Sequence, residues 1–227
     1  MNNIEKNLKH IRRQIREAEI AHDRDPGSVL LLAVSKKKPA AGIRFAWQLG
    51  ERDFGENYLQ EAQQKMLALK DLDINWHFVG AIQSNKTRSI AEAFAWAHCI
   101  DRLKIAQRLS NQRPVTLPAL NICIQVNLDE EPSKAGISLD AVPQLAEKID
   151  RLPNIRLRGL MAIPAPSDDF EHQRMTFARL AATLDQLQQM GIACDTLSMG
   201  MTQDMSAAIA AGSTLVRIGT AIFGERS

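Results

Sequence analysis

The chain has 227 residues, 45% apolar and 24% charged, and its 28 basic and 26 acidic residues leave a net charge of +2. These fractions are typical of a globular protein and exclude collagen-like, low-complexity and disulfide-stapled classes. Charges of both signs alternate along the sequence, so no basic stripe indicates nucleic-acid binding. No apolar run approaches the roughly 20 residues that cross a bilayer, and we expect no membrane-spanning segment.

The N-terminal stretch and the cysteines indicate the compartment. Charged residues are scattered through the first twenty positions, which therefore lack the apolar core of a secretory signal. Cys99, Cys123 and Cys194 lie far apart and form no CxxC pair. We expect a cytoplasmic protein with three reduced, mostly buried thiols, no disulfide and no metal site.

The predicted elements begin with an amphipathic helix over residues 3–20, where apolar side chains from Ile4 to Ala18 recur at steps of three and four. Asp25-Pro26-Gly27 ends this helix. The continuous apolar run 29–34 then predicts a strand buried on both faces. The remaining predicted strands are 52–55, 75–79, 97–100, 119–127, 155–162, 196–199 and 214–218, separated by helices 40–49, 59–69, 86–95, 103–111, 139–151, 170–190 and 203–211.

This alternation predicts the fold class. Strands that alternate with helices form a parallel sheet covered by helices, and eight such units in a chain of this length suit a closed barrel. An open doubly wound sheet is the rival, but no GxGxxG motif follows the first strand. We therefore predict an α/β protein, a (β/α)8 TIM barrel with an extra N-terminal helix. No linker divides it, so residues 1–227 are expected to form a single domain.

In a TIM barrel the loops after the strands build the active site, and the first such loop contains Lys36. Partial desolvation and the neighbouring charges of Lys37 and Lys38 favour a neutral amine at this position, and a neutral amine can form an imine with an aldehyde. The competing interpretation is a solvated loop of three lysines.

The last two strand ends predict a phosphate site, which barrels commonly build there. Two segments each offer a hydroxyl group and backbone N–H groups beside a glycine, namely Ser198-Met199-Gly200 and Gly219-Thr220. Arg217 should point inward or to the mouth of the barrel, where its guanidinium needs an acceptor, either a carboxylate such as Glu225 or a ligand atom. An amine, a phosphate cradle and a cation together suit the aldehyde, phosphate and ring nitrogen of pyridoxal 5′-phosphate.

A series of motifs runs in order from the first strand to the C-terminus. They are Ala33-Val34-Ser35-Lys36 followed by Pro39, Phe54-Gly55-Glu56-Asn57-Tyr58, His77-Phe78-Val79-Gly80 with Gln83-Ser84-Asn85-Lys86, Arg158-Gly159-Leu160-Met161, Leu197-Ser198-Met199-Gly200-Met201 with Asp204-Met205, and Val216-Arg217-Ile218-Gly219-Thr220-Ala221-Ile222-Phe223-Gly224. Together these motifs are highly specific, and they resemble those of the pyridoxal phosphate homeostasis protein family. Two positions depart from the family pattern: Ile82 stands where leucine is usual and keeps its shape, and Thr202 stands where serine is usual and keeps its hydroxyl.

The resemblance implies a barrel of the alanine racemase N-terminal type that holds pyridoxal 5′-phosphate as an aldimine of Lys36. It further implies that Arg217 faces the pyridine nitrogen, that Asn57 lies beside the ring, and that the loops at the last two strands hold the phosphate. Family members are thought to buffer or deliver the cofactor, affecting amino-acid and keto-acid balance, without an established enzyme activity. The implied cofactor-binding set is Lys36, Asn57, Ser198, Met199, Gly200, Arg217, Gly219 and Thr220, with client apoenzymes as possible partners.

The principal alternative is a pyridoxal phosphate enzyme with weak amino-acid racemase activity. An arginine at the ring nitrogen disfavours protonation there and weakens the cofactor as an electron sink. Tyr58 is the only tyrosine, and no second domain supplies another across a dimer interface, so we expect a monomer and not a two-base racemase. From the residues alone, a barrel aldolase with Lys36 as its Schiff base and a protein scaffold also remain open.

The remaining histidines and lysines receive less specific interpretations. His77 is interpreted as a hydrogen-bonded core histidine rather than a base, and the other four histidines as surface residues. A group of lysines is expected to form a basic rim that attracts an anion; a sharper hypothesis is that Lys38 competes with Lys36 for the aldehyde and helps to release the cofactor. The histidines interpreted as surface residues are His10, His22, His98 and His172, and the rim lysines are Lys37, Lys38, Lys86 and Lys134.

Overall fold

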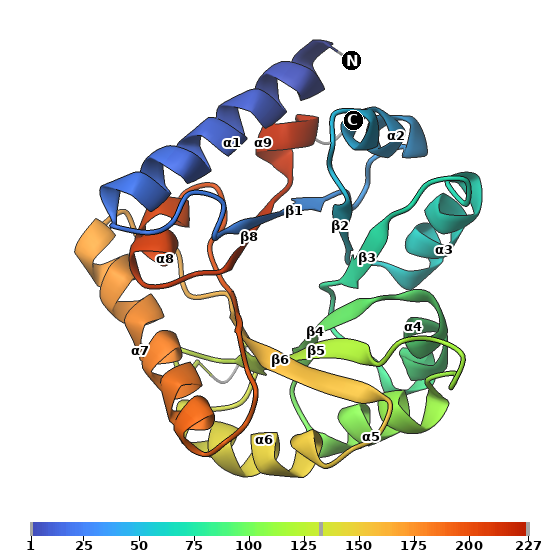
Figure 1. Cartoon of the computed structure of the whole chain (residues 1–227), viewed down its shortest axis with the longest axis vertical. Coiled ribbons are helices and arrows are strands. Elements are labelled where there is room, and N and C mark those ends of the chain that lie inside the picture. The colour runs from blue at the N-terminus through green and yellow to red at the C-terminus, as the bar shows by residue number, and fades with distance from the viewer. Residues whose placement is uncertain (1, 132–133, 226–227) are drawn as a thin grey trace.

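The computed structural model of the protein describes residues 2–131 and 134–225. Parallel strands close into an eight-membered barrel in chain order, with β8 pairing back to β1 (Figure 1). The predicted barrel is therefore confirmed. The strands are β1 (Leu30–Val34), β2 (Asp53–Glu56), β3 (Asn75–Phe78), β4 (Trp96–Ile100), β5 (Leu120–Val126), β6 (Ile155–Ala162), β7 (Thr196–Ser198) and β8 (Leu215–Ile218).

Helices surround the barrel on its outside (Figure 1). The predicted ends agree with the structure to within two residues, except that the helix expected over 139–151 begins with a 3₁₀ turn, and a short last helix was not predicted. The helices are α1 (Asn2–Ala21), α2 (Ala40–Gln48), α3 (Leu59–Ala68), η1 (Ser84–Lys86), α4 (Thr87–Ala93), α5 (Leu103–Gln112), η2 (Leu139–Ala141), α6 (Val142–Asp150), α7 (Phe170–Gln189), α8 (Met205–Ala210) and α9 (Thr220–Phe223).

The extra N-terminal helix α1 supports the last part of the barrel. Its apolar side chains, including Leu8, Ile11 and Ile15, are buried, and each such side chain contributes about 1.5–3 kcal/mol when fully buried. The helix packs against α9, α8 and α2. The Asn7 side chain also donates a hydrogen bond to the carbonyl of Ile222 in α9, at 3.0 Å. Thus α1 holds the helix that starts at Thr220, at the mouth of the barrel.

The core has two parts. A large apolar cluster includes the side chains packed between the strands and the surrounding helices. A second, small cluster consists of Leu32, Val79 and Leu215. Cys99 and Cys194 are free and buried, and burial raises the pKa of each thiol to about 12. These thiols are thus protonated and unreactive at neutral pH.

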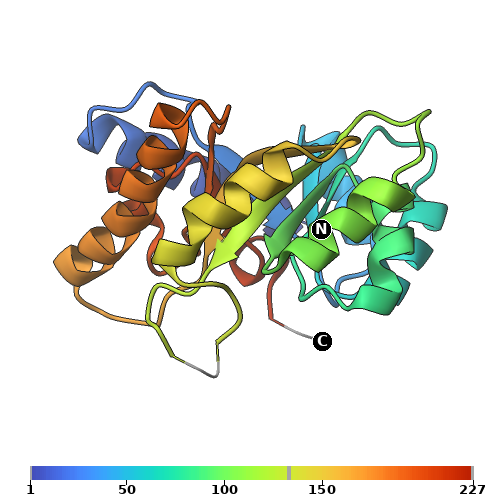
Figure 2. The ribbon, with the colours of Figure 1, turned by 90° about the horizontal axis from the view of Figure 1, so that it is seen from below.

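The described residues contain neither a cluster suited to a metal ion nor a helix suited to a bilayer. No group of three or more histidine, cysteine, aspartate or glutamate side chains is placed to hold a metal ion among residues 2–131 and 134–225. Within the same ranges, no helix is both long and apolar enough to span a bilayer. Figure 2 shows the barrel from the side, with the described residues that follow α9 and the described parts of the loop that follows β5 projecting from the same face.

Candidate cofactor site

A cavity of about 260 Å³ opens at the C-terminal ends of the strands. It brings together five of the predicted site residues, whereas Ser198, Met199 and Gly200 are not among the described residues that line it. We call it the Lys36 cavity. Its lining residues are Val34, Lys36, Lys38, Asn57, Val79, Ile163, Met201, Thr202, Arg217, Gly219 and Thr220.

The turn after β1 presents Lys36 to this cavity. The backbone N–H of Lys38 donates to the carbonyl of Ser35 at 3.0 Å, which closes the turn. Lys37 adopts a φ of +59°, the left-handed region that side chains other than glycine rarely occupy. Its N–H donates to Glu61 Oε1 at 2.5 Å. The backbone around Lys36 is therefore held by specific contacts on both sides.

A buried charged cluster lies behind this turn. The ammonium of Lys65 donates to the Ser35 carbonyl at 2.7 Å, to Glu56 Oε1 at 2.7 Å and to Glu61 Oε1 at 2.6 Å. The Ser35 hydroxyl also donates to Glu56 Oε1, at 2.6 Å. Burial raises the pKa of Glu56, although the hydrogen bonds from Lys65 and Ser35 oppose this effect. The cluster fixes Ser35 and hence the start of the Lys36 turn.

Arg217 lies at the inner wall of the Lys36 cavity, and its guanidinium donates three hydrogen bonds to neutral acceptors. Its Nη1 donates to the Ser198 carbonyl at 2.5 Å and to Ser198 Oγ at 2.8 Å, and its Nη2 donates to the Ala162 carbonyl at 2.9 Å. The carboxylate acceptor suggested from sequence, Glu225, is not used; its carbonyl instead accepts from Lys38 Nζ at 2.5 Å. Burial lowers the pKa of Arg217, yet a guanidinium remains protonated in proteins. Among the described residues, the hydrogen-bond acceptors of this charge are all neutral.

The loops after β7 and β8 differ in how they meet the cavity. Gly200 has a φ of +97°, and a Cβ there would lie 2.7 Å from the Cβ of Ala208. Its carbonyl accepts the Arg217 N–H at 2.9 Å, so this segment pairs with β8. Gly219 lines the cavity, where a Cβ would approach the Val34 carbonyl to 3.0 Å. Helix α9 begins immediately after it, and the first N–H groups of a helix have no intrahelical partner.

The four rim lysines divide between separate places. Lys38 lines the Lys36 cavity, and Lys86 lines a neighbouring one that shares Asn57. The Lys37 ammonium lies 5.9 Å from the centre of the Tyr58 ring. Lys134 pairs with Asp129 at 2.6 Å and lines a third cavity. Only Lys38 of the four therefore borders the cavity that contains Lys36.

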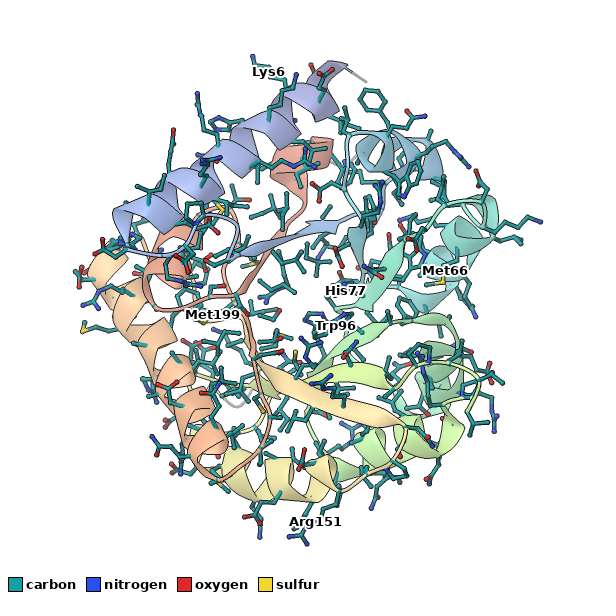
Figure 3. The ribbon with its side chains drawn as sticks, in the orientation of Figure 1. Lys6, Met66, His77, Trp96, Arg151 and Met199 are labelled. Carbon is teal, nitrogen blue, oxygen red and sulfur yellow. The ribbon has the colours of Figure 1, made fainter. Side chains whose placement is uncertain are left out.

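The interpretation of His98 as a surface residue is wrong. His98 lies on β4 and is completely buried, as is His77 on β3. His77 bonds both to His98, at 2.9 Å, and to Asp53, at 3.1 Å, which agrees with its interpretation as a hydrogen-bonded core histidine. Figure 3 shows His77 beside Trp96 at the inner wall of the barrel. The inner face of a barrel strand is buried, so a polar residue there is not at the surface.

Comparison with known proteins identifies the family. The sequence profile described as "Alanine racemase, N-terminal domain" matches residues 2–227. The "Pyridoxal phosphate homeostasis protein" of Pseudomonas aeruginosa is 57% identical over 226 residues, covering 100% of this chain and 97% of that protein. The chain belongs to the pyridoxal phosphate homeostasis protein family. The Escherichia coli K12 family member of the same name is 50% identical over 229 residues, covering 100% and 98% of the two chains.

Solved structures agree with this assignment. One solved structure is described as PipY of Synechococcus elongatus with PLP bound. It superposes on this protein with a TM-score of 0.85 at 35% identity, covering 97% of this chain and 100% of that one. Alanine racemase from Corynebacterium glutamicum gives a TM-score of 0.72 at 16% identity over 99% of this chain and 61% of that enzyme. The second likeness shows a shared barrel fold alone.

Proposed function

We propose that this member of the pyridoxal phosphate homeostasis protein family binds pyridoxal 5′-phosphate through a Schiff base to Lys36. The observation that carries the proposal is the composition of the Lys36 cavity. Three cationic side chains, Lys36, Lys38 and Arg217, line it, and its described lining contains no aspartate or glutamate. Such a cavity favours an anion, and one of its cations is an amine able to condense with an aldehyde.

The residues present fit the three polar groups of the cofactor. Lys36 would meet the aldehyde, Gly219 and Thr220 would hold the phosphate through backbone N–H and hydroxyl groups, and Arg217 would face the ring nitrogen. Asn57 would lie beside the ring, because its Oδ1 is buried and has no hydrogen-bond partner among the described residues.

The Ser198-Met199-Gly200 segment would have a supporting part in this site. The Ser198 hydroxyl bonds to Arg217 and His98, so a direct contact with the phosphate requires those bonds to change. We propose that this segment instead forms the wall behind the phosphate and leads to Met201 and Thr202, which line the Lys36 cavity.

We further propose that the role is to buffer or deliver the cofactor to client apoenzymes in the cytoplasm, with the protein acting as a monomer. When bound, pyridoxal 5′-phosphate supplies an aldehyde that exchanges between amines. The chain supplies little else for catalysis. Tyr58 is 51% exposed and does not belong to the described lining of the Lys36 cavity, and an arginine at the ring nitrogen disfavours its protonation. These features favour binding and release over racemisation.

A spectroscopic titration tests the proposal. Purified protein receives increasing pyridoxal 5′-phosphate, and the visible band of the imine is followed in the wild type, in Lys36→Ala and in Lys104→Ala, a control at an exposed lysine of α5. We expect equal saturable bands in the wild type and Lys104→Ala, and only weak, non-covalent binding in Lys36→Ala. An unchanged band in Lys36→Ala, or no uptake by the wild type, contradicts the proposal.

The racemase alternative requires a different assay. The loaded protein is incubated with a panel of single-enantiomer amino acids, and optical activity is recorded. We expect no turnover above that of free pyridoxal 5′-phosphate, whereas a saturable loss of optical activity that disappears in Lys36→Ala establishes the enzyme instead. Transfer of the cofactor to an added apoenzyme, measured by the activity that it regains, tests delivery, and sedimentation tests the monomeric state.

A further inference from the structure

A line of hydrogen-bonded side chains crosses the inside of the barrel and ends at Arg217. Asp53 Oδ1 lies 3.1 Å from His77 Nε2, and His77 Nδ1 lies 2.9 Å from His98 Nε2. His98 Nδ1 lies 2.9 Å from Ser198 Oγ, which accepts from Arg217 Nη1 at 2.8 Å. These residues come from β2, β3, β4, β7 and β8. Since β4 and β7 are not neighbours in the closed barrel, this line, the interior line, spans its inside.

The interior line replaces the usual filling of such a barrel. Branched apolar side chains normally fill the inside of a TIM barrel, and a buried polar group is costly unless it is hydrogen-bonded. Here His77, His98 and Ser198 are completely buried and Arg217 is 6% exposed. Only Asp53, at the start of the line, has partial access to solvent, with a side chain 16% exposed. Every group along the line has a partner, as this burial demands.

The chemistry of the two ends fixes the direction of the hydrogen bonds. Arginine can only donate and an ionised aspartate can only accept, while a neutral imidazole carries one donor and one acceptor. With both rings neutral, Ser198 donates to His98 Nδ1, His98 Nε2–H donates to His77 Nδ1, and His77 Nε2–H donates to Asp53. The opposite direction would set the Nε2 lone pair of His77 against the carboxylate and therefore requires one extra proton.

Burial supports the neutral arrangement. It lowers the pKa of His77, against the raising effect of Asp53. It also lowers the pKa of His98, and a positive charge on His77 or Arg217 acts in the same direction. Both rings thus stay neutral at physiological pH, each with its proton on Nε2. The hydroxyl proton of Ser198 then points to His98, which leaves an oxygen lone pair directed at the guanidinium of Arg217.

We propose that Asp53, His77, His98 and Ser198 are positioning residues that orient Arg217 toward the ring of the bound cofactor. This inference rests on the proposed function, in which Arg217 faces the ring nitrogen. The two carbonyl contacts of Arg217 come from the ends of β6 and β7, so Ser198 Oγ is its only side-chain acceptor among the described residues. Loss of the interior line would allow the guanidinium to turn, without removing the Lys36 amine or the phosphate contacts.

The first test needs no substitution and no cofactor. Nitrogen-15 NMR of the full chain, labelled at histidine, reports the protonation and tautomer of each ring at neutral pH. We expect two buried histidines, both neutral and both protonated on Nε2, distinct from the exposed rings. A positively charged ring at His77 or His98, or a proton on Nδ1 of either, overturns the proposal. This result is independent of whether the protein binds pyridoxal 5′-phosphate.

The second test compares matched variants by their dissociation constants for pyridoxal 5′-phosphate and by the visible band of the bound cofactor. We expect His98→Ala and Ser198→Ala each to weaken binding on the order of tenfold and to shift the band. The double variant should be no weaker than either single one, because both break one line. The variant His98→Asn keeps an acceptor near the position of Nδ1 and should therefore restore most of the affinity for the cofactor. The control variant His10→Ala changes an exposed ring and should leave the affinity unchanged.

The outcomes separate the two proposals. Wild-type affinity and spectrum in His98→Ala, or additive losses in the double variant, contradict the interior line while leaving Lys36 binding intact. A wild type that takes up no cofactor contradicts the proposed function, and the NMR result then decides the arrangement of the line alone.

Discussion

Lys65 is the residue whose replacement should reveal how the Lys36 turn is supported. Its side chain is 7% exposed, and its Glu56 partner is fully buried. In Lys65→Met a methionine fills much of the same volume but donates no hydrogen bond, so Glu56 keeps a buried charge with only the Ser35 hydroxyl as a partner. Glu56 Oε2 already has no hydrogen-bond partner in the wild type. Removing one member of a buried ion pair typically costs about 3–5 kcal/mol.

This cost should depend on pH. Lys65 lowers the pKa of Glu56 by its charge and its hydrogen bond, against the raising effect of burial, so its loss raises that pKa further. A carboxyl group with a raised pKa in the folded state contributes stability at low pH that is lost as the pH rises through that pKa. The free energy of unfolding of Lys65→Met should therefore fall as the pH rises above about 4.3, the ordinary pKa of an unfolded glutamate, and more steeply than that of the wild type.

Urea unfolding at two pH values measures both effects, with Lys70→Met, at an exposed position, as the control. The control should stay within about 0.5 kcal/mol of the wild type. A loss of 3–5 kcal/mol corresponds to a fall of about 6–20 °C in the melting temperature of a domain of this size. Adding Glu56→Gln to Lys65→Met should recover part of the loss, because glutamine carries no charge. A cost below about 1 kcal/mol, or one independent of pH, refutes the reasoning.

Further predictions concern the backbone and the rim. Gly159→Ala should cost more than about 3 kcal/mol in urea unfolding, because its Cβ would lie 1.9 Å from the Thr196 carbonyl at a φ of +155°; a stable variant contradicts this geometry. Gly80→Ala should weaken pyridoxal 5′-phosphate binding about tenfold, because its Cβ would lie 2.3 Å from the Asn57 carbonyl oxygen and would displace Asn57. Equal titration curves for the variant and the wild type would exclude this displacement of Asn57. Lys38→Ala should leave the Lys36 imine band intact but slow transfer to an apoenzyme, and an unchanged transfer rate removes Lys38 from the release step.

The fold could be predicted from the sequence because β1 is a continuous apolar run and short strand candidates alternate regularly with helical patterns along the chain. The strand ends indicated Lys36, Arg217, Gly219 and Thr220, and the family resemblance added Asn57. The barrel places all five around one cavity. Helix α9 was not predicted because its four residues are too few for a 3.6-residue pattern.

The supporting contacts could not be predicted in the same way. Glu56 and Lys65 belong to different elements, and their pairing depends on how α3 packs behind β2. The acceptors of Arg217 are largely backbone carbonyls. Every residue has a backbone carbonyl, so the residue types in the sequence do not identify these acceptors. The interpretation of His98 as a peripheral surface residue is wrong because His98 lies within the predicted strand 97–100, and the inner face of such a strand is buried. Alternation of polar and apolar residues along the strands could have placed it at the inner wall.

Borohydride reduction followed by mass analysis of the labelled peptide tests the central claim most directly, because it locates the covalent bond. The loaded protein is reduced, digested outside residues 35–39 and fragmented so that Lys36, Lys37 and Lys38 are resolved. We predict one pyridoxyl phosphate group, attached to Lys36. Attachment to another lysine as the major product, or a protein that carries no label after reduction, contradicts the claim.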